Sequence, residues 1–219
     1  MEALAATCAE AGVKYLLLGG SLLLTQQMEA CIAAFRKRAS IPIILFPGSP
    51  AQVTPAADAL LYLSLVSGRN AELLIGQHVT SAAMVRASRL ETISTGYLLI
   101  DGGIPTTVSY ISNTQPIPNN KPEIALATAW AAEMQGKHVL YLEAGSGAQI
   151  PVSVDMIRMV SSQTSIPLIV GGGIRTAEKI YENALAGANL LVVGTAAEQT
   201  PSLIPQMAAA IRQANLERK

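Results

Sequence analysis

An acidic residue with small neighbours stands at the end of an apolar strand pattern in YLEAGSG, residues 141–147. The strand is expected over residues 138–142, and the four residues after Glu143 are too small to shield its carboxylate. Partial burial would raise the pKa of this carboxyl, so that it could hydrogen-bond a substrate hydroxyl and take its proton. Tyr141 offers a hydroxyl, and the glycines and serine of the segment offer further donors. The alternatives for Glu143 are that it caps a helix or pairs with Arg175.

Two loops further along the chain have the composition of a phosphate site. Gly171-Gly172-Gly173 follows one apolar strand and Gly194-Thr195 follows the next. Glycine lets backbone N–H groups close around an anion, and a helix capped by Thr176 would add partial positive charge there. A (β/α)8 barrel binds phosphate with two such loops, after its seventh and eighth strands. The alternative is that the glycines serve only turns, although three in succession exceed what one turn requires.

Other candidate residues carry weaker signals. Ser21 follows Gly19-Gly20 at a strand end, where its hydroxyl could bind Mg²⁺ or pyrophosphate or merely terminate the strand. No Asp-rich cluster of the kind that binds pyrophosphate through metal occurs in the sequence. Solvated roles are expected for Arg69 and Lys121, and structural roles for His78 and His138. Metal-ligand spacings, Ser-His-Asp arrangements and the dinucleotide fingerprint are absent from the sequence.

The elements that would position these residues alternate along the chain. Seven apolar segments, near residues 15, 41, 59, 95, 139, 168 and 190, predict buried parallel strands. Helices are expected over residues 1–12, 26–38 (capped by Thr25), 71–87, 121–135, 154–162, 176–185 and 201–216. The alternation predicts an α/β barrel in which the carboxyl ends of the strands carry the site.

Three irregularities distinguish this pattern from a regular barrel. The connection between the strands near 41 and 59 is short and proline-rich, so one outer helix is missing. Residues 101–120 form an unusually long loop, which suggests a lid or substrate wall. No strand precedes the first helix, so two strand edges would be exposed unless a neighbouring chain or residues 90–93 cover them.

Composition limits the class of protein. A chain of 219 residues suits a single domain, 1–219. The net charge is zero without a basic run, which argues against nucleic acid as a partner. Half of the residues are hydrophobic and 14% are charged, which favours either many strands buried on both faces or surface hidden in a homo-oligomer. No apolar run is long enough for a membrane span and the two cysteines look like core thiols, so we expect a cytoplasmic protein.

Seven segments of the chain match one known family in its own order. They are FPGSP (46–50), SLVSGRN (64–70), IGQH (75–78), PIPNNKPEIA (116–125), YLEAGSGA (141–148), PLIVGGGIR (167–175) and AGANLLVVGTAAE (186–198). Together they resemble geranylgeranylglyceryl phosphate synthase, also called prenylglyceryl phosphate synthase. The similarity covers nearly the whole chain, and DGG-PT-VSYISNT (residues 101–114) is closest to the bacterial, Bacteroidetes-like branch.

The resemblance implies a fold and a reaction. The fold is α/β, a modified TIM (β/α)8 barrel without its third outer helix, and the first strand is absent from this chain. The enzymes join the 3-hydroxyl of sn-glycerol 1-phosphate to C1 of a prenyl diphosphate such as geranylgeranyl diphosphate, with Mg²⁺, and release pyrophosphate. A homo-oligomer, either a dimer or a hexamer, is expected.

The resemblance also implies roles for particular residues. Glu143 would bind and deprotonate the attacking hydroxyl, and Ser21 would match a hydroxyl ligand to Mg²⁺. An apolar furrow across the barrel top would take the prenyl chain. The residues expected to bind glycerol 1-phosphate are Tyr141, Leu142, Glu143, Ala144, Gly145, Ser146, Gly147, Gly172, Gly173, Gly194 and Thr195.

One departure from the family leaves alternatives open. The family's first strand ends in a motif of the form Ile-Asp-Pro-Asp-Lys, which supplies an Asp to Mg²⁺ and a Lys to phosphate, and this sequence has no copy of it. A second hypothesis is therefore a phosphate-binding barrel that is catalytically impaired or non-catalytic. A third, an isomerase or synthase using the same phosphate site, needs a second acid–base residue, and only Glu143 is well placed.

Overall fold

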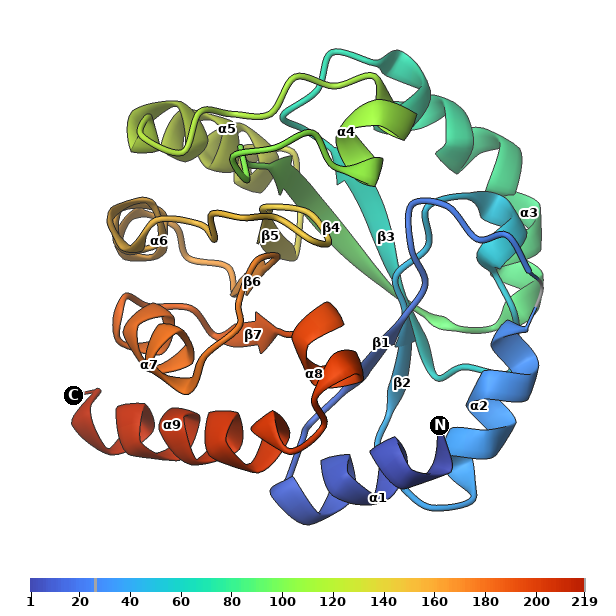
Figure 1. Ribbon diagram of the computed structural model, residues 1–219. Helices are drawn as coiled ribbons and strands as arrows, with labels where there is room; N and C mark the ends of the chain where they lie inside the picture. The colour runs from blue at the N-terminus through green and yellow to red at the C-terminus, as the bar shows by residue number, and fades with distance from the viewer. Residues whose placement is uncertain (26, 219) are drawn as a thin grey trace.

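The computed structural model describes residues 1–25 and 27–218, and its centre is one curled parallel sheet surrounded by helices (Figure 1). The sheet has seven strands in the order in which they occur along the chain, and each pairs in parallel with the next. All seven expected strands are present: β1 (Leu16–Leu18), β2 (Ile43–Leu45), β3 (Ala59–Leu65), β4 (Glu91–Leu99), β5 (Val139–Glu143), β6 (Leu168–Gly171) and β7 (Leu190–Val192).

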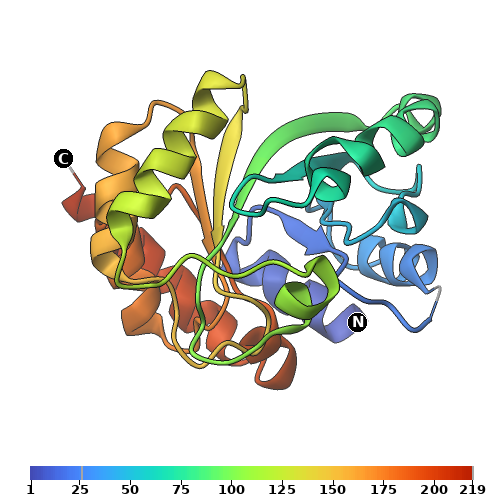
Figure 2. The same cartoon turned by 90° about the horizontal axis from the view of Figure 1, so that it is seen from above.

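Most helices cover the outside of the sheet, whereas α4 (Thr107–Ser112) and α8 (Thr195–Gln199) lie at the mouth of its hollow; the N-terminal and C-terminal halves of the chain stand on opposite sides of that hollow (Figure 2). The others are α1 (Glu2–Ala11), α2 (Met28–Arg36), α3 (Gln77–Ser88), α5 (Pro122–Met134), α6 (Val154–Gln163), α7 (Ala177–Leu185) and α9 (Leu203–Glu217). No helix among the described residues is long and apolar enough to cross a membrane.

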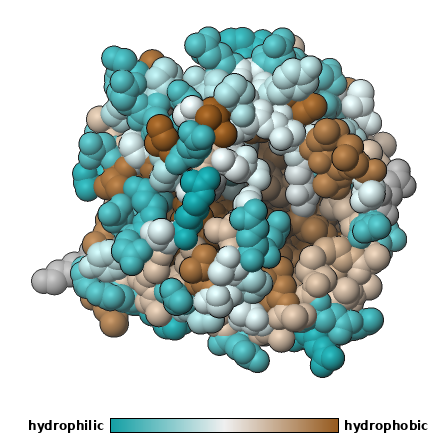
Figure 3. Space-filling model, in the orientation of Figure 1, coloured by the Kyte–Doolittle hydropathy of each residue, from teal (hydrophilic) through white to brown (hydrophobic). Residues whose placement is uncertain are grey.

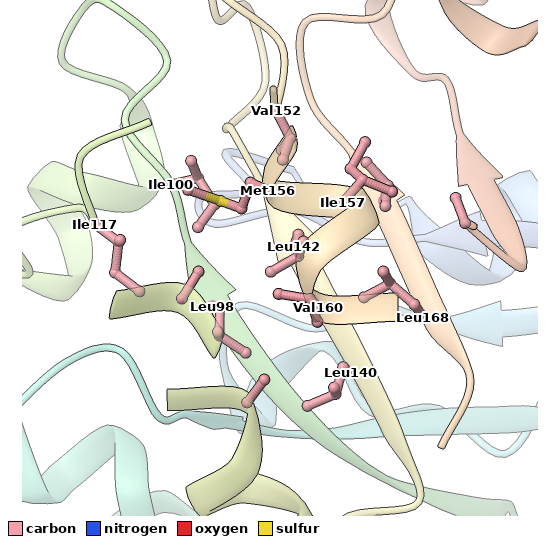
Figure 4. Close-up of a cluster of buried hydrophobic side chains, with 14 of the residues drawn as sticks. Leu98, Ile100, Ile117, Leu140, Leu142, Val152, Met156, Ile157, Val160 and Leu168 are labelled. Carbon is pink, nitrogen blue, oxygen red and sulfur yellow. The ribbon is translucent and has the colours of Figure 1, made fainter. Parts of the chain in front are cut away.

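Alternation along each strand sends side chains in two directions. Leu61 and Tyr97 point into the hollow of the sheet, where they pack with inward residues of the neighbouring strands. Leu98, Leu140 and other outward residues pack against α5 and α6 (Figure 4). Burying each such aliphatic side chain contributes about 1.5–3 kcal/mol, which is why nearly continuous apolar runs form these strands.

The connection between β2 and β3 contains no α-helix. It holds one 3₁₀ turn, η1 (Pro50–Gln52), which begins on a proline. This confirms the expected loss of one outer helix. The next helical segment opens with a π-helical turn, η2 (Glu72–Gly76), before α3 begins.

The sheet is open between its first and last strands. β1 and β7 stand at the two ends of the strand order, and all their residues are partly exposed, whereas β2 is buried throughout. The sequence placed residues 90–93 as a possible cover for these edges, and that expectation is wrong. Glu91 to Ile93 pair with Ala59 to Leu61 of β3, because they begin the long strand β4.

Some helix boundaries differ from those expected. Thr25 does not cap α2, whose N-cap is Gln27 without a side-chain hydrogen bond. The last helix begins at Leu203 rather than at Pro201. Two short helices were not among those expected: α8 follows β7, and α4 lies in the long loop, where Thr106 and Ser109 form a reciprocal capping box.

Candidate active site

A cavity of about 1190 Å³ opens at the carboxyl ends of the strands and continues between β7 and β1. The space-filling view shows the molecule hollowed near the middle of this face (Figure 3). The structure brings most of the expected site residues to its wall. Those that line it are Ser21, Tyr141, Glu143, Gly145, Ser146, Gly147, Gly172, Gly173, Gly194 and Thr195.

Leu142 and Ala144 do not line the cavity. Successive side chains of a strand alternate between the two faces of its sheet, so the neighbours of Glu143 face the other way. Leu142 points toward Met156 and Val160 of α6, as Figure 4 shows, and Ala144 belongs to the same outer cluster. Their side chains therefore stabilise the outer core rather than the mouth.

Glu143 is held inside the wall of the cavity. Its side chain is only 6% exposed, and Oε1 accepts a hydrogen bond from the Gly145 N–H at 2.7 Å. Burial raises the pKa of this carboxyl, and the nearby Tyr141 hydroxyl and the hydrogen bond from the Gly145 N–H partly oppose that rise. It is the only buried acidic residue in the described part of the chain. A carboxylate in this setting gains stability when it takes up a proton.

Neither alternative for Glu143 is found. Arg175 points its guanidinium at the loop after β5, where it donates to the Ala148 carbonyl at 2.8 Å. The same group reaches the carbonyls of Gly147 and Gln149 at 3.5 Å. Arg175 thus braces the glycine-rich loop and leaves Glu143 free to act on a ligand.

Aromatic rings form the inner wall below Glu143. Tyr141 stacks on Phe46 with ring centroids 5.1 Å apart and meets Tyr97 edge-on at 5.5 Å. The Tyr141 hydroxyl is buried and has no partner in full hydrogen-bond geometry, although it lies near the Glu143 carboxylate. Burial raises its pKa well above the usual value, so the phenol stays protonated as a donor.

The glycines after β6 are required by close packing as well as by backbone conformation. Gly172 has φ +82°, and a Cβ built there would lie 2.4 Å from Glu143 Oε1 and 2.6 Å from the Gly145 nitrogen. Gly173 also has positive φ, and the Thr176 side chain accepts from the Lys179 N–H as the expected cap of α7. The loops after β5 and β6 can therefore close on each other only because side chains are missing.

The loops after β5 and β7 also meet. The hydroxyls of Ser146 and Thr195 are hydrogen-bonded at 3.2 Å. This contact joins Thr195, at the start of α8, to the glycine-rich loop after β5. The three C-terminal strands consequently present small residues, hydroxyls and the N-terminus of α7 around one space, which suits a small phosphorylated molecule.

Two positioning side chains were missed at the level of the sequence. Gln52 is buried, accepts from the N–H groups of Gly20 and Gly48, and donates to the Gly20 carbonyl at 2.7 Å. Asn119 bonds both to the Pro151 carbonyl and to the Ser153 N–H. Each joins two loops that are distant in sequence, and neither lies in a spacing pattern that would have revealed it.

The contacts of His78 agree with the expected structural role, and Arg69 and Lys121, expected to be solvated, are exposed. Half-buried His78 places Nε2 2.7 Å from the Leu63 carbonyl, and burial lowers its pKa. Arg69 donates to the carbonyl of Gly68, its neighbour. Exposed Lys121 lies 3.9 Å from Glu123.

The residues present fit a resident metal ion poorly. The described residues hold no group of three or more His, Cys, Asp or Glu side chains that could bind one. Ser21 contributes one hydroxyl, whereas Mg²⁺ favours carboxylate and other oxygen ligands in larger numbers. Magnesium binding through Ser21 stays a prediction, and no catalytic step is assigned to the ion.

Known proteins resemble this chain over nearly its whole length. The PcrB family profile matches residues 1–214. A geranylgeranylglyceryl phosphate synthase from Chitinophaga pinensis is 59% identical over 211 residues, which are 96% of this chain and 84% of that protein. The enzyme of the same name from Pyrococcus abyssi is 39% identical over 91% of this chain and 79% of its own length.

A solved structure agrees with the sequence comparison. The crystal structure of (S)-3-O-geranylgeranylglyceryl phosphate synthase from Thermoplasma acidophilum, in complex with sn-glycerol-1-phosphate, superposes with a TM-score of 0.91 at 33% identity. The match covers 97% of this chain and 87% of that one. By sequence and by fold, this chain belongs to the PcrB family, with the geranylgeranylglyceryl phosphate synthases.

Proposed function

We propose that this protein transfers a prenyl group, geranylgeranyl or a similar chain, from prenyl diphosphate to the 3-hydroxyl of sn-glycerol 1-phosphate. The observation that carries the proposal is the buried carboxyl of Glu143 beside two glycine loops at the barrel mouth. The relatives named for this synthesis, and the relative crystallised with glycerol phosphate, support it.

The acceptor would be held by the C-terminal strands. Backbone N–H groups of the glycine loops and the N-terminus of α7 would face its phosphate. Its 3-hydroxyl would donate to Glu143, which takes the proton as O3 forms a bond to C1 of the prenyl group. The C1–oxygen bond to the diphosphate breaks, and pyrophosphate leaves with its electron pair.

The apolar inner wall would hold the donor's hydrocarbon chain. Phe46, Tyr97 and Leu65 line the same cavity as Glu143. Such a wall binds a prenyl chain by removing it from water rather than through directed contacts. Dependence on Mg²⁺, a dimeric or hexameric state and a cytoplasmic location stay predictions.

An assay with both substrates tests the function. Purified protein is incubated with sn-glycerol 1-phosphate and radiolabelled geranylgeranyl diphosphate, with Mg²⁺ or with EDTA, and the organic phase is analysed for the ether product. We expect product with Mg²⁺ and a large loss with EDTA. Binding of sn-glycerol 1-phosphate by calorimetry without any turnover would instead support the alternative of a non-catalytic phosphate-binding barrel.

A further inference from the structure

Three segments beside the cavity mouth contain no charged residue. They are residues 19–25 after β1, 46–57 after β2 and 102–120 after β4; Asp101 precedes the last of them, and Asp58 follows the second. Charged residues make up 14% of the whole chain, so their absence from three neighbouring segments is a local property. Surface loops without charge lose little hydration energy when they are covered by an apolar phase.

The same loops expose large apolar side chains. Leu24 is 89% exposed on the loop after β1, and Tyr110 is 85% exposed on α4. Figure 3 shows hydrophobic side chains bordering the hollow of this face. The exposed members of this mouth rim, as we call it, are Leu22, Leu23, Leu24, Ile104, Tyr110 and Ile111.

The mouth rim continues into the cavity. Ile111 is half exposed on α4 and also lines the cavity, together with its neighbour Val108. Further inside, the wall continues with Phe46 and Leu73 and reaches Glu143. An apolar path therefore leads from the surface of the protein to the carboxyl group.

We propose that the mouth rim docks on the surface of a phospholipid bilayer, from which the prenyl substrate enters the cavity. The inference rests on the proposed function, because a substrate with a long hydrocarbon chain partitions into bilayers. Leucine and isoleucine side chains would enter the boundary between headgroups and acyl chains, and Tyr110 suits the headgroup level.

The absence of charge decides the kind of bilayer. Binding to anionic lipid depends on clusters of Lys and Arg and weakens with salt. The three segments that carry the mouth rim have neither basic nor acidic residues. Of the charged residues that flank the third segment, exposed Asp101 is acidic and would not attract anionic lipid, and Lys121 already lies close to Glu123. Binding therefore depends on apolar burial, and it occurs on neutral phosphatidylcholine and persists at high salt.

Co-sedimentation with phosphatidylcholine vesicles tests the proposal. The wild-type chain is compared with the double variants Leu24→Glu/Tyr110→Glu and Leu24→Gln/Tyr110→Gln. The matched control is Met134→Glu/Leu216→Glu, which changes side chains of nearly equal exposure, 84% and 86%, near the C-terminal ends of α5 and α9. Circular dichroism at matched concentration verifies that all variants remain folded.

We expect wild type and control to bind with partition coefficients within about twofold of each other, in both 50 mM and 500 mM salt. The Glu rim variant should bind at least about tenfold more weakly, and the Gln variant should also be weakened, since each buried apolar side chain contributes to partitioning. Absence of wild-type binding, equal loss in rim and control variants, or binding only to anionic vesicles at low salt would overturn the proposal. So would rim-dependent self-association without vesicle binding, which would assign the rim to a second copy.

Measuring prenyl transfer with dissolved and with vesicle-bound donor distinguishes a failure of membrane docking from a failure of the proposed function. Leu24 and Tyr110 do not line the cavity, so the rim variants should retain wild-type kcat on a short, water-dissolved prenyl diphosphate. On geranylgeranyl diphosphate presented in vesicles they should be slowed in proportion to the lost binding. If wild type binds vesicles but never transfers a prenyl group, the function fails and the docking surface stands.

Discussion

The two sides of the barrel mouth are built on different principles. The side formed by β5, β6 and β7 is tightly packed: its loops interlock through Gly172, Arg175 and the Ser146–Thr195 contact around a buried carboxyl. The side formed by β1 and β2 has one candidate hydroxyl, Ser21, and its loops are held by Gln52. In those two loops the only charged residue is Asp58, directly before β3.

This difference indicates a division of labour. The C-terminal side is preorganised for a small polar molecule, because its donors are set by backbone and need no rearrangement. The N-terminal side offers apolar surface and little charge, and β1 is itself a partly exposed edge. Acceptor recognition should therefore depend steeply on single residues, whereas donor recognition should depend on many weak apolar contacts.

The steepest dependence is expected at Gly172. In Gly172→Ala the new methyl group would meet Glu143 Oε1 and the Gly145 nitrogen below 3 Å, so the two loops must separate. We expect at least about a hundredfold loss of kcat/KM, since misplacement by about 1 Å can cost that much. The matched control is Gly136→Ala, which has similar φ, +77°, but no atom within 4 Å. An equal loss in both variants would attribute the effect to backbone strain and not to the interlocked loops.

Arg175→Met should weaken the acceptor side less severely. The variant keeps the aliphatic stem but loses the hydrogen bonds to the carbonyls of residues 147–149. We expect the Kd for sn-glycerol 1-phosphate to rise about tenfold, as befits lost hydrogen bonds to a charged group. Calorimetry measures it, with exposed Arg158→Met as control. An unchanged Kd would show that the loop holds its shape without this brace.

On the other side of the mouth, Gln52→Leu should have a smaller effect. It removes the bonds that join the loops after β1 and β2, near Ser21. We expect KM for the prenyl diphosphate to rise about threefold to tenfold, with the Kd for sn-glycerol 1-phosphate unchanged, since one brace of about 1–2 kcal/mol is lost. A change in the acceptor's Kd instead would contradict the division between the two sides.

Replacing Glu143 by Gln should lower activity but raise the stability of the fold at neutral and alkaline pH. Burial raises the pKa of this carboxyl in the folded state above 4.5, so the folded chain binds more protons than the unfolded chain between the two values. Wild-type stability therefore falls as pH rises through that window, and the loss persists above it. Glu143→Gln should melt at the same temperature as wild type near pH 4 and a few degrees higher at pH 8. A lower melting temperature at pH 8 would indicate that the carboxylate stabilises the fold.

Much of this arrangement can be predicted from the sequence, because apolar runs that end in small residues mark the strands and the loops of the site. The seven strands were located, and Glu143, the two glycine loops and the Thr176 cap lie where the pattern placed them. Alternation within residues 141–144 already separates Tyr141 and Glu143 from Leu142 and Ala144.

Other features depend on packing that no local pattern contains. Gln52 and Asn119 hydrogen-bond to groups 32 or more residues away, so their roles exist only in the folded chain. The six-residue helix α4 lacks the acidic or amide N3 residue usual in a capping box and uses Ser109 instead. The expected side-chain cap at Thr25 was wrong because α2 begins three residues later.

The most direct test of the account is the turnover of Glu143→Gln. The amide keeps the size of the side chain and can still accept from the Gly145 N–H, but it cannot take a proton. Single-turnover measurements with saturating prenyl diphosphate, together with calorimetry for sn-glycerol 1-phosphate, compare it with wild type. We predict a rate lower by about 10²–10⁴-fold with a Kd within about threefold, as loss of a general base requires. A variant that turns over within a few-fold of wild type would contradict the assignment of Glu143 as the base.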